Sequence, residues 1–122
     1  IAGDLEDVER WCDILKLLPN GQMPAIAFKA RALAQCDRYQ EAKTLILDAV
    51  RKYPNELDIL IACGDVMMRY PQSETAMSNA TRGYQRAVEI FKLNDNDISR
   101  QREIELRLRQ ARENLSACAA GR

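Results

Sequence analysis

The stretch DRYQEAKTLILDAVRKYPNE, residues 37–56, decides the fold. Within it, Tyr39, Ala42, Ile46 and Ala49 follow one another at steps of three, four and three residues. Such steps return to one face of an α-helix, which completes a turn about every 3.6 residues. Pro54 comes five residues later, and it ends the helix because proline cannot continue one. The stretch therefore predicts an amphipathic helix with one buried face.

The rest of the chain also predicts helices, over residues 4–18, 24–35, 38–53, 56–70, 73–93 and 98–118. Their boundaries carry residues that start and stop helices: Pro19 and Gly21 follow the first, Ser73 caps the fifth, and the polar run 94–97 precedes the sixth. β-branched residues are sparse and never alternate with polar ones, so no strand competes. The predicted fold class is all-α, with about six helices.

Composition limits the kinds of partner. The 122 residues are 47% hydrophobic, which is enough for the core of one domain. Lys+Arg and Asp+Glu both total 18, so no overall field attracts nucleic acid or an anionic membrane. No apolar run approaches the roughly 20 residues of a membrane span. The chain begins at Ile1 rather than at a methionine, and we expect it to be a segment of a longer protein.

The cysteines predict thiols rather than a metal site. Cys12, Cys36, Cys63 and Cys118 lie far apart, and the chain has no histidine. A zinc site needs closely spaced cysteines or histidines, so we expect no metal. The alternative is the disulfide framework of a secreted protein, but a helical core needs no such cross-links. We expect reduced thiols in the cytoplasm or another reducing intracellular compartment.

Catalytic signals are equally weak. No histidine is present to activate a thiol or hydroxyl, and no glycine-rich loop is present to hold a phosphate. Neighbouring acids such as Glu6 and Asp7 fall on predicted solvated helix surfaces. We therefore expect no enzyme activity and no cofactor.

The steps of the opening stretch occur again. Ala80, Tyr84, Ala87 and Val88 reproduce the spacing of Ala42, Ile46, Ala49 and Val50, and Trp11, Ile14 and Pro19 reproduce its later part. In the helices between, Ala30 and Gly64 are small residues 34 positions apart, where a neighbouring helix would approach closely. A period of 34 residues with two helices in each unit predicts a repeat that must stack on its neighbours.

This pattern resembles the tetratricopeptide repeat (TPR) family. Residues 23–56 match it throughout, with Phe28, Ala30, Tyr39, Ala42, Ile46, Ala49, Pro54 and Asn55 in register. Residues 57–94 match as a second repeat with about four inserted residues near Tyr70, and they carry Lys92 where the closing proline belongs. Residues 4–20 look like a partial repeat or a capping helix, and residues 97–118 like a C-terminal capping helix. A single TPR-like domain would then cover residues 1–122.

The resemblance implies antiparallel helix hairpins stacked as a right-handed superhelix, whose concave groove binds a partner helix or peptide. By register, the groove-facing residues are Ala27, Arg31, Ala34, Gln35, Ile61, Asp65, Met68 and Arg69. An exposed Ile61 and Met68 beside Arg31 and Arg69 would suit an amphipathic ligand. The alternative is that the last helix covers this face.

The sequence of the last helix, residues 98–118, is typical of a helix that caps the end of a repeat array. Its apolar stripe is narrow and consists of Ile104, Leu108, Ala111, Leu115 and Cys118. Glu103 with Arg107 and Glu105 with Arg109 stand four residues apart, so the spacing predicts solvated pairs within the helix. An RNA-binding patch or pairing of this helix between chains is the less favoured alternative.

We therefore expect a protein-interaction module, a segment of a scaffold or adaptor. Two alternatives stay open. One is a small dedicated chaperone for an aggregation-prone client, and the other is self-assembly through the repeat ends. A homo-oligomer would form through the helix at residues 4–18, where Leu5, Val8 and Trp11 lack a neighbour to pack against.

Overall fold

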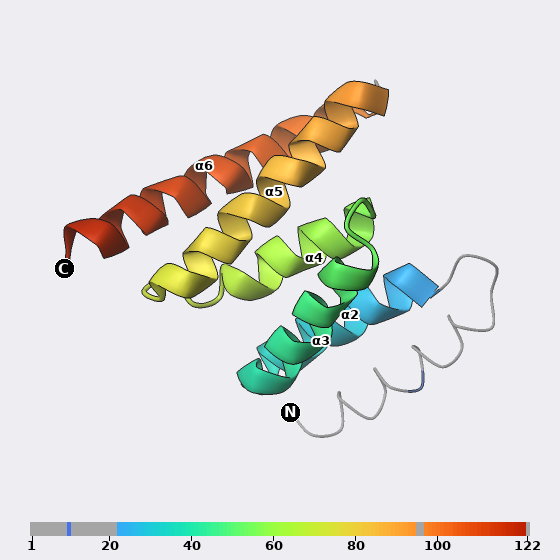
Figure 1. Cartoon of the computed structure of the whole chain (residues 1–122), viewed down its shortest axis with the longest axis horizontal. Coiled ribbons are helices and arrows are strands. Elements are labelled where there is room, and N and C mark those ends of the chain that lie inside the picture. The colour runs from blue at the N-terminus through green and yellow to red at the C-terminus, as the bar shows by residue number, and fades with distance from the viewer. Residues whose placement is uncertain (1–9, 11–21, 95–96, 122) are drawn as a thin grey trace.

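The computed structural model describes residue 10, residues 22–94 and residues 97–121. Over these residues the chain forms α2 (Gln22–Gln35), α3 (Tyr39–Lys52), α4 (Leu57–Met67), α5 (Glu74–Asn94) and α6 (Ile98–Ala120), and no strand (Figure 1). The prediction of an all-α fold is confirmed. Of the helix predicted over residues 4–18, only residue 10 is among the described residues, so the count of about six stays a prediction.

The helix boundaries differ from the predicted ones mainly at α4. The sequence predicted a helix to Tyr70, but α4 ends at Met67. Beyond it, the amide of Arg69 donates to Val66 and the amide of Tyr70 donates to Met67, across three residues instead of four. The chain therefore tightens into a turn there. Elsewhere the observed ends lie within two residues of the predicted ones.

Two helix starts have side-chain caps. Ser73 Oγ accepts a hydrogen bond of 3.1 Å from the Ala76 amide at the start of α5, as predicted. Asp97 Oδ1 accepts one of 3.1 Å from the Arg100 amide at the start of α6. Both bonds satisfy backbone donors that a helix start leaves unpaired. They fix where the two long helices begin.

Helices that are close in sequence pack against each other. α2 packs against α3 and α4, α3 packs against α4, α4 packs against α5, and α5 packs against α6. Figure 1 shows α4 between the α2 and α3 pair and the long α5 and α6 pair. α4 thus has helices on several sides, and it is apolar almost all round. Its buried residues are Ile59, Leu60, Ile61, Ala62, Cys63, Gly64, Val66 and Met67.

Positions that match in the predicted repeats are buried alike. Ala42, Ile46 and Ala49 of α3 are buried, and so are their counterparts Ala80, Tyr84 and Ala87 of α5. The two helices therefore turn equivalent faces toward the core. Phe28 departs from the pattern, because this large apolar residue of α2 is 43% exposed.

The close approach expected at Gly64 is present between α4 and α5. A Cβ atom at Gly64 would lie 2.3 Å from Cε1 and 2.4 Å from Cζ of Tyr84. Such distances are far below van der Waals contact, so only glycine fits beside this ring. Gly83 of α5 faces α4 in turn, since a Cβ there would lie 3.0 Å from the Leu60 carbonyl oxygen. Two glycines therefore let α4 and α5 pack closely.

Candidate functional site

The structure divides the eight residues that were predicted to face a concave groove. Ala27, Ala34 and Ile61 are buried. Arg31, Asp65 and Met68 are partly buried, and Gln35 and Arg69 are exposed. The prediction of an exposed Ile61 is wrong. Ile104 of α6 lines the same cavity as Ile61, and α4 is covered on that side.

Asp65 is the centre of a charged cluster that joins four helices. Its Oδ2 accepts hydrogen bonds from Nε and Nη2 of Arg31 at 3.1 and 3.0 Å. Its Oδ1 accepts bonds from the Tyr84 hydroxyl at 2.7 Å and from Arg107 Nη1 at 3.0 Å. We call Arg31, Asp65, Tyr84 and Arg107 the Asp65 cluster. One carboxylate of α4 thus holds side chains of α2, α5 and α6.

The electrostatics of the Asp65 cluster keep Tyr84 neutral. Burial raises the pKa of the Tyr84 hydroxyl far above its usual value, and the charge of Asp65 and their hydrogen bond raise it further. The hydroxyl therefore remains a donor to the carboxylate. The two guanidinium groups supply the positive charge that stabilises Asp65. Each group in the cluster is paired with another, so its geometry is that of a structural joint.

Beside the cluster lies a cavity of about 400 Å³, lined by Arg31, Ile61, Asp65, Arg100, Glu103, Ile104 and Arg107. Four of these residues belong to α6. The last helix therefore covers part of the face that the resemblance assigned to a ligand, as the alternative interpretation had it.

The arginines of α6 reach beyond their own helix. Arg107 pairs with Glu103 as predicted, and it also binds Asp65 of α4. Arg100 pairs with Asp58 of α4 at 3.5 Å, and Arg112 donates to Gln85 of α5. The predicted pair of Glu103 with Arg107 is therefore confirmed, and Arg100, Arg107 and Arg112 in addition contact neighbouring helices. They attach α6 to its neighbours because the narrow apolar stripe leaves charged side chains at the edges of the contact.

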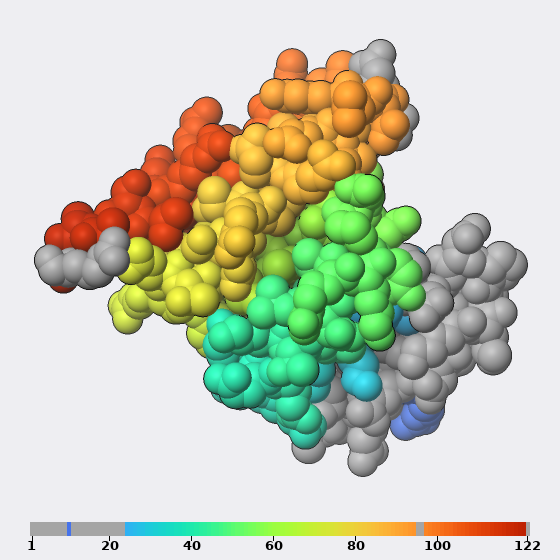
Figure 2. Space-filling model, viewed as in Figure 1, coloured from blue at the N-terminus to red at the C-terminus, as the bar shows by residue number. Residues whose placement is uncertain are grey.

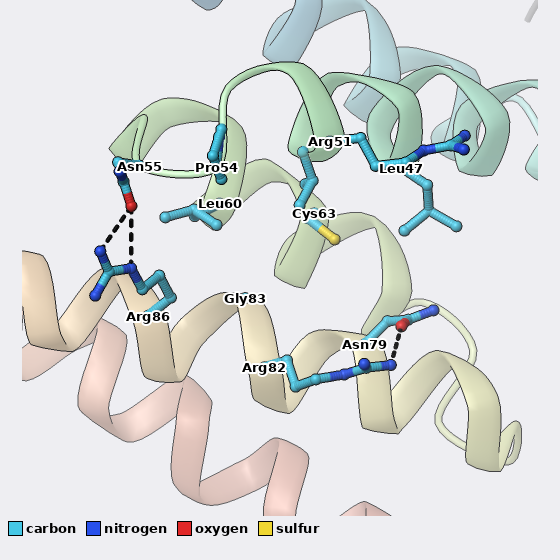
Figure 3. Close-up of a pocket in the computed structure, with 11 residues that line it drawn as sticks. Leu47, Arg51, Pro54, Asn55, Leu60, Cys63, Asn79, Arg82, Gly83 and Arg86 are labelled. Carbon is cyan, nitrogen blue, oxygen red and sulfur yellow. Dashed lines mark hydrogen bonds between the residues drawn. The ribbon is translucent and has the colours of Figure 1, made fainter.

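A second surface lies on another side of α4, between α3 and α5. We call it the α3–α5 groove, and it has a volume of about 610 Å³ (Figure 3). Figure 2 shows the molecular surface hollowed between these two helices. The groove is lined by Leu47, Val50, Arg51, Pro54, Asn55, Leu60, Cys63, Asn79, Arg82, Gly83 and Arg86. Its volume is in the usual range for ligand sites, about 300–1,000 Å³.

The floor of the α3–α5 groove is apolar. Leu60 and Cys63 of α4 form its base, with Gly83 of α5 beside them. Leu47 and Val50 of α3 are half-buried on one wall. Leu60 and Cys63 are each only 3% exposed, so the apolar surface that a partner could cover is mainly that of Leu47, Val50 and Pro54.

The rim of the groove is basic. Arg86 donates to Asn55 Oδ1 from Nε and Nη2 at 3.2 and 2.7 Å, which links α5 to the turn after α3. Arg82 Nη2 donates to Asn79 Oδ1 at 2.9 Å. Arg51 lies on the α3 side, and none of the lining residues is a carboxylate. The groove therefore combines an apolar floor with three guanidinium groups.

Sequence reasoning missed this groove, although a signal was present. Leu47, Val50 and Pro54 stand at steps of three and four residues, off the stripe that begins at Tyr39. Leu47 and Val50 form a second apolar row on α3, and Pro54 continues it in the turn after the helix.

Cys63 is chemically quiet under neutral conditions. Burial raises the pKa of its thiol from 9.0 to about 11, and the charge of Arg82 only partly opposes this effect. A protonated thiol is a poor nucleophile. Cys63 therefore serves as apolar floor, and it and Cys118 are free thiols.

The same pKa predicts a loss of stability at high pH. Between pH 9.0 and about 11, the unfolded chain releases a proton that folded Cys63 retains. Stability is thus complete below pH 9 and falls as pH rises toward 11, by roughly 3 kcal/mol in all. Urea unfolding should show the decline, and Cys63→Ala should decline less. The window from pH 9.0 to 10.0 is the decisive one, because unfolded tyrosine, with a pKa of 10.0, is still mostly protonated there. Equal declines in both proteins within it would contradict the assignment.

Comparison with known proteins finds no protein-family model, no curated protein and no solved structure that matches this chain. Within residues 22–94 and 97–121, no group of acids and cysteines is placed to hold a metal ion. No helix in the described part of the chain is long and apolar enough to cross a membrane.

Proposed function

We propose that this chain is a protein-interaction module that holds a partner helix in the α3–α5 groove. The observation that carries the proposal is an open groove of about 610 Å³ with an apolar floor between two helices. The module acts by binding rather than by catalysis, as a segment of a scaffold or adaptor. The concave face is the weaker candidate, because the charges of the Asp65 cluster are already paired with one another.

The proposed architecture is a TPR-like stack of the α2–α3 and α4–α5 hairpins with α6 as cap. The packing of α2 against α4, and of α3 against α4, supports the stacking of one hairpin on the next. The equivalent burial of α3 and α5 faces supports a repeat. On α6 only Ile104, Leu108 and Ala111 are buried, which suits a terminal helix with a polar outer surface.

The shape of the groove favours a helical partner. On the α5 side its lining residues are Asn79, Arg82, Gly83 and Arg86, at positions i, i+3, i+4 and i+7. On the α3 side, Leu47 and Val50 stand three residues apart on the helix, and Pro54 follows in the turn after it. Rows with this spacing are the ridges between which side chains of another helix pack. A partner helix with apolar residues at the same spacing would fit between them.

Methyl NMR of the whole chain tests the site. The probe is a synthetic amphipathic helix with leucines at i, i+3, i+4 and i+7 and glutamines elsewhere, so that it carries no side-chain charge. We expect shifts in the methyl signals of Leu47, Val50 and Leu60, which line the groove. Leu108 of α6 is the matched control, because it is buried away from the groove.

Two outcomes would contradict the proposal. Shifts confined to Ile61 and Ile104 would move the site to the cavity beside the Asp65 cluster. Saturating peptide without any methyl shift would show that the groove does not bind a helix.

A further inference from the structure

We infer that the α3–α5 groove selects an acidic helix, one that carries Asp or Glu on both flanks of its apolar stripe. This inference rests on the proposed function and adds to it the chemistry of the partner. The occupant of the groove is then a helical segment of another protein.

The first support is that the groove is more positively charged than the chain as a whole. The chain as a whole has 18 basic and 18 acidic residues. The lining of the groove has three arginines and no acid. A neutral protein thus presents a locally positive rim around an apolar floor, which is complementary to an acidic amphipathic helix.

The second support is what these arginines contact. Arg82 donates to the side-chain amide of Asn79, and Arg86 donates to that of Asn55. An amide carries no net charge, so the charge of Arg82 is not neutralised by this bond. Arg86 differs, because it also pairs with Glu89 at 3.1 Å. Arg82, together with Arg51 on the opposite helix, is therefore the main source of positive potential.

The third support is where the arginines lie. Figure 3 shows Arg51 on α3, and Arg82 and Arg86 on α5, across the groove from it. A helix that buries its apolar stripe between α3 and α5 would have one guanidinium on one flank and two on the other. Acidic residues on both flanks would satisfy this arrangement, whereas lysines there would be repelled.

A charge series of peptides tests the inference. Three synthetic helices share one leucine stripe and carry flanks of glutamate, glutamine or lysine, and fluorescence anisotropy measures their affinities. We expect the glutamate helix to bind about tenfold more tightly than the glutamine helix at low salt, and the lysine helix to bind most weakly. The difference should shrink as salt is raised, because the rim is exposed and screened.

A second experiment reverses the charge of two arginines on the protein. Arg51→Glu with Arg82→Glu should abolish or invert the preference for glutamate flanks. Both residues are exposed, and the only bond described for either is that of Arg82 to Asn79 within α5, so the fold should be retained. Arg102→Glu with Arg109→Glu changes net charge equally on the exposed part of α6, outside the groove. This control variant should keep the preference, and circular dichroism should show equal helicity in both.

Each remaining outcome overturns the inference in a recognisable way. Equal affinity for glutamate and glutamine helices, with groove methyl shifts for both, would remove the charge selection and leave the proposed function standing. Loss of preference in the α6 control would show a general charge effect. If anionic vesicles or an RNA homopolymer bound more tightly than the peptides, with the same dependence on Arg51 and Arg82, the occupant would be a lipid surface or RNA instead.

Discussion

Gly64→Ala is expected to lower the free energy of unfolding by about 3 kcal/mol, the upper part of the usual range for overpacked cores. The added Cβ would lie within 2.3–2.7 Å of three ring carbons of Tyr84. Tyr84 is buried, and its hydroxyl is held by Asp65 at 2.7 Å, so the ring has no room to move aside. Relief requires α4 and α5 to separate. Urea denaturation monitored by circular dichroism would measure the loss.

Two further variants make this result specific. Gly121→Ala should change stability by no more than about 0.5 kcal/mol, because a Cβ there meets its nearest atom at 3.5 Å. Gly64→Ala combined with Tyr84→Ile recreates Ala30 and Ile46, which hold the matching positions in the other proposed repeat unit and are both buried. We expect the double variant to lose clearly less than the sum of the two single losses. Strict additivity would show that the alanine and the ring do not collide.

Asp65→Asn should lower the free energy of unfolding by about 2 kcal/mol. The asparagine keeps the shape of the side chain, but it loses the charge that pairs with Arg31 and Arg107 and turns an amide group toward them. Removing one member of a fully buried pair costs more, about 3–5 kcal/mol. The loss is smaller here because the side chains of Arg31 and Arg107 are 38% and 37% exposed and retain water.

Asp48→Asn is the matched control for this variant. Asp48 pairs with Lys52 at 3.2 Å within α3, and both side chains are at least half exposed. Its removal should cost no more than about 0.5 kcal/mol. Similar small effects of the two substitutions would show that the Asp65 cluster is an ordinary surface network rather than a joint between four helices.

Local features of this chain could be predicted from the sequence. The steps from Tyr39 to Ala49 placed α3, and Ser73 placed the start of α5, because helix periodicity and caps depend on residues within a few turns. The all-α fold followed from the same reasoning. The end of α4 was predicted too late, since the turn at Arg69 is set by backbone bonds that no distinctive residue announces.

The candidate sites depend on contacts between residues that are far apart in the chain, and such contacts are harder to predict from the sequence. Ile61 was predicted to be exposed because its burial depends on residues about 40 positions away in α6, whose placement the sequence did not specify. Asp65 and Arg31 were both assigned to the same face, but their pairing with each other was not foreseen. The row of Leu47, Val50 and Pro54 was visible in the sequence. This row borders a groove only because α4 holds α3 and α5 apart, and the sequence does not show that arrangement.

The position of α6 at one edge of the described helices has a consequence for local opening. α6 packs chiefly against α5, with polar links to α4, and so it forms the outermost cooperative unit of the described chain. Such a unit can detach for a short time without unfolding what lies beneath it. Every residue that lines the α3–α5 groove belongs to α3, α4, α5 or the turn between α3 and α4. Fraying of α6 would therefore uncover the Asp65 side of α4 while a partner helix remained bound in the groove on the other.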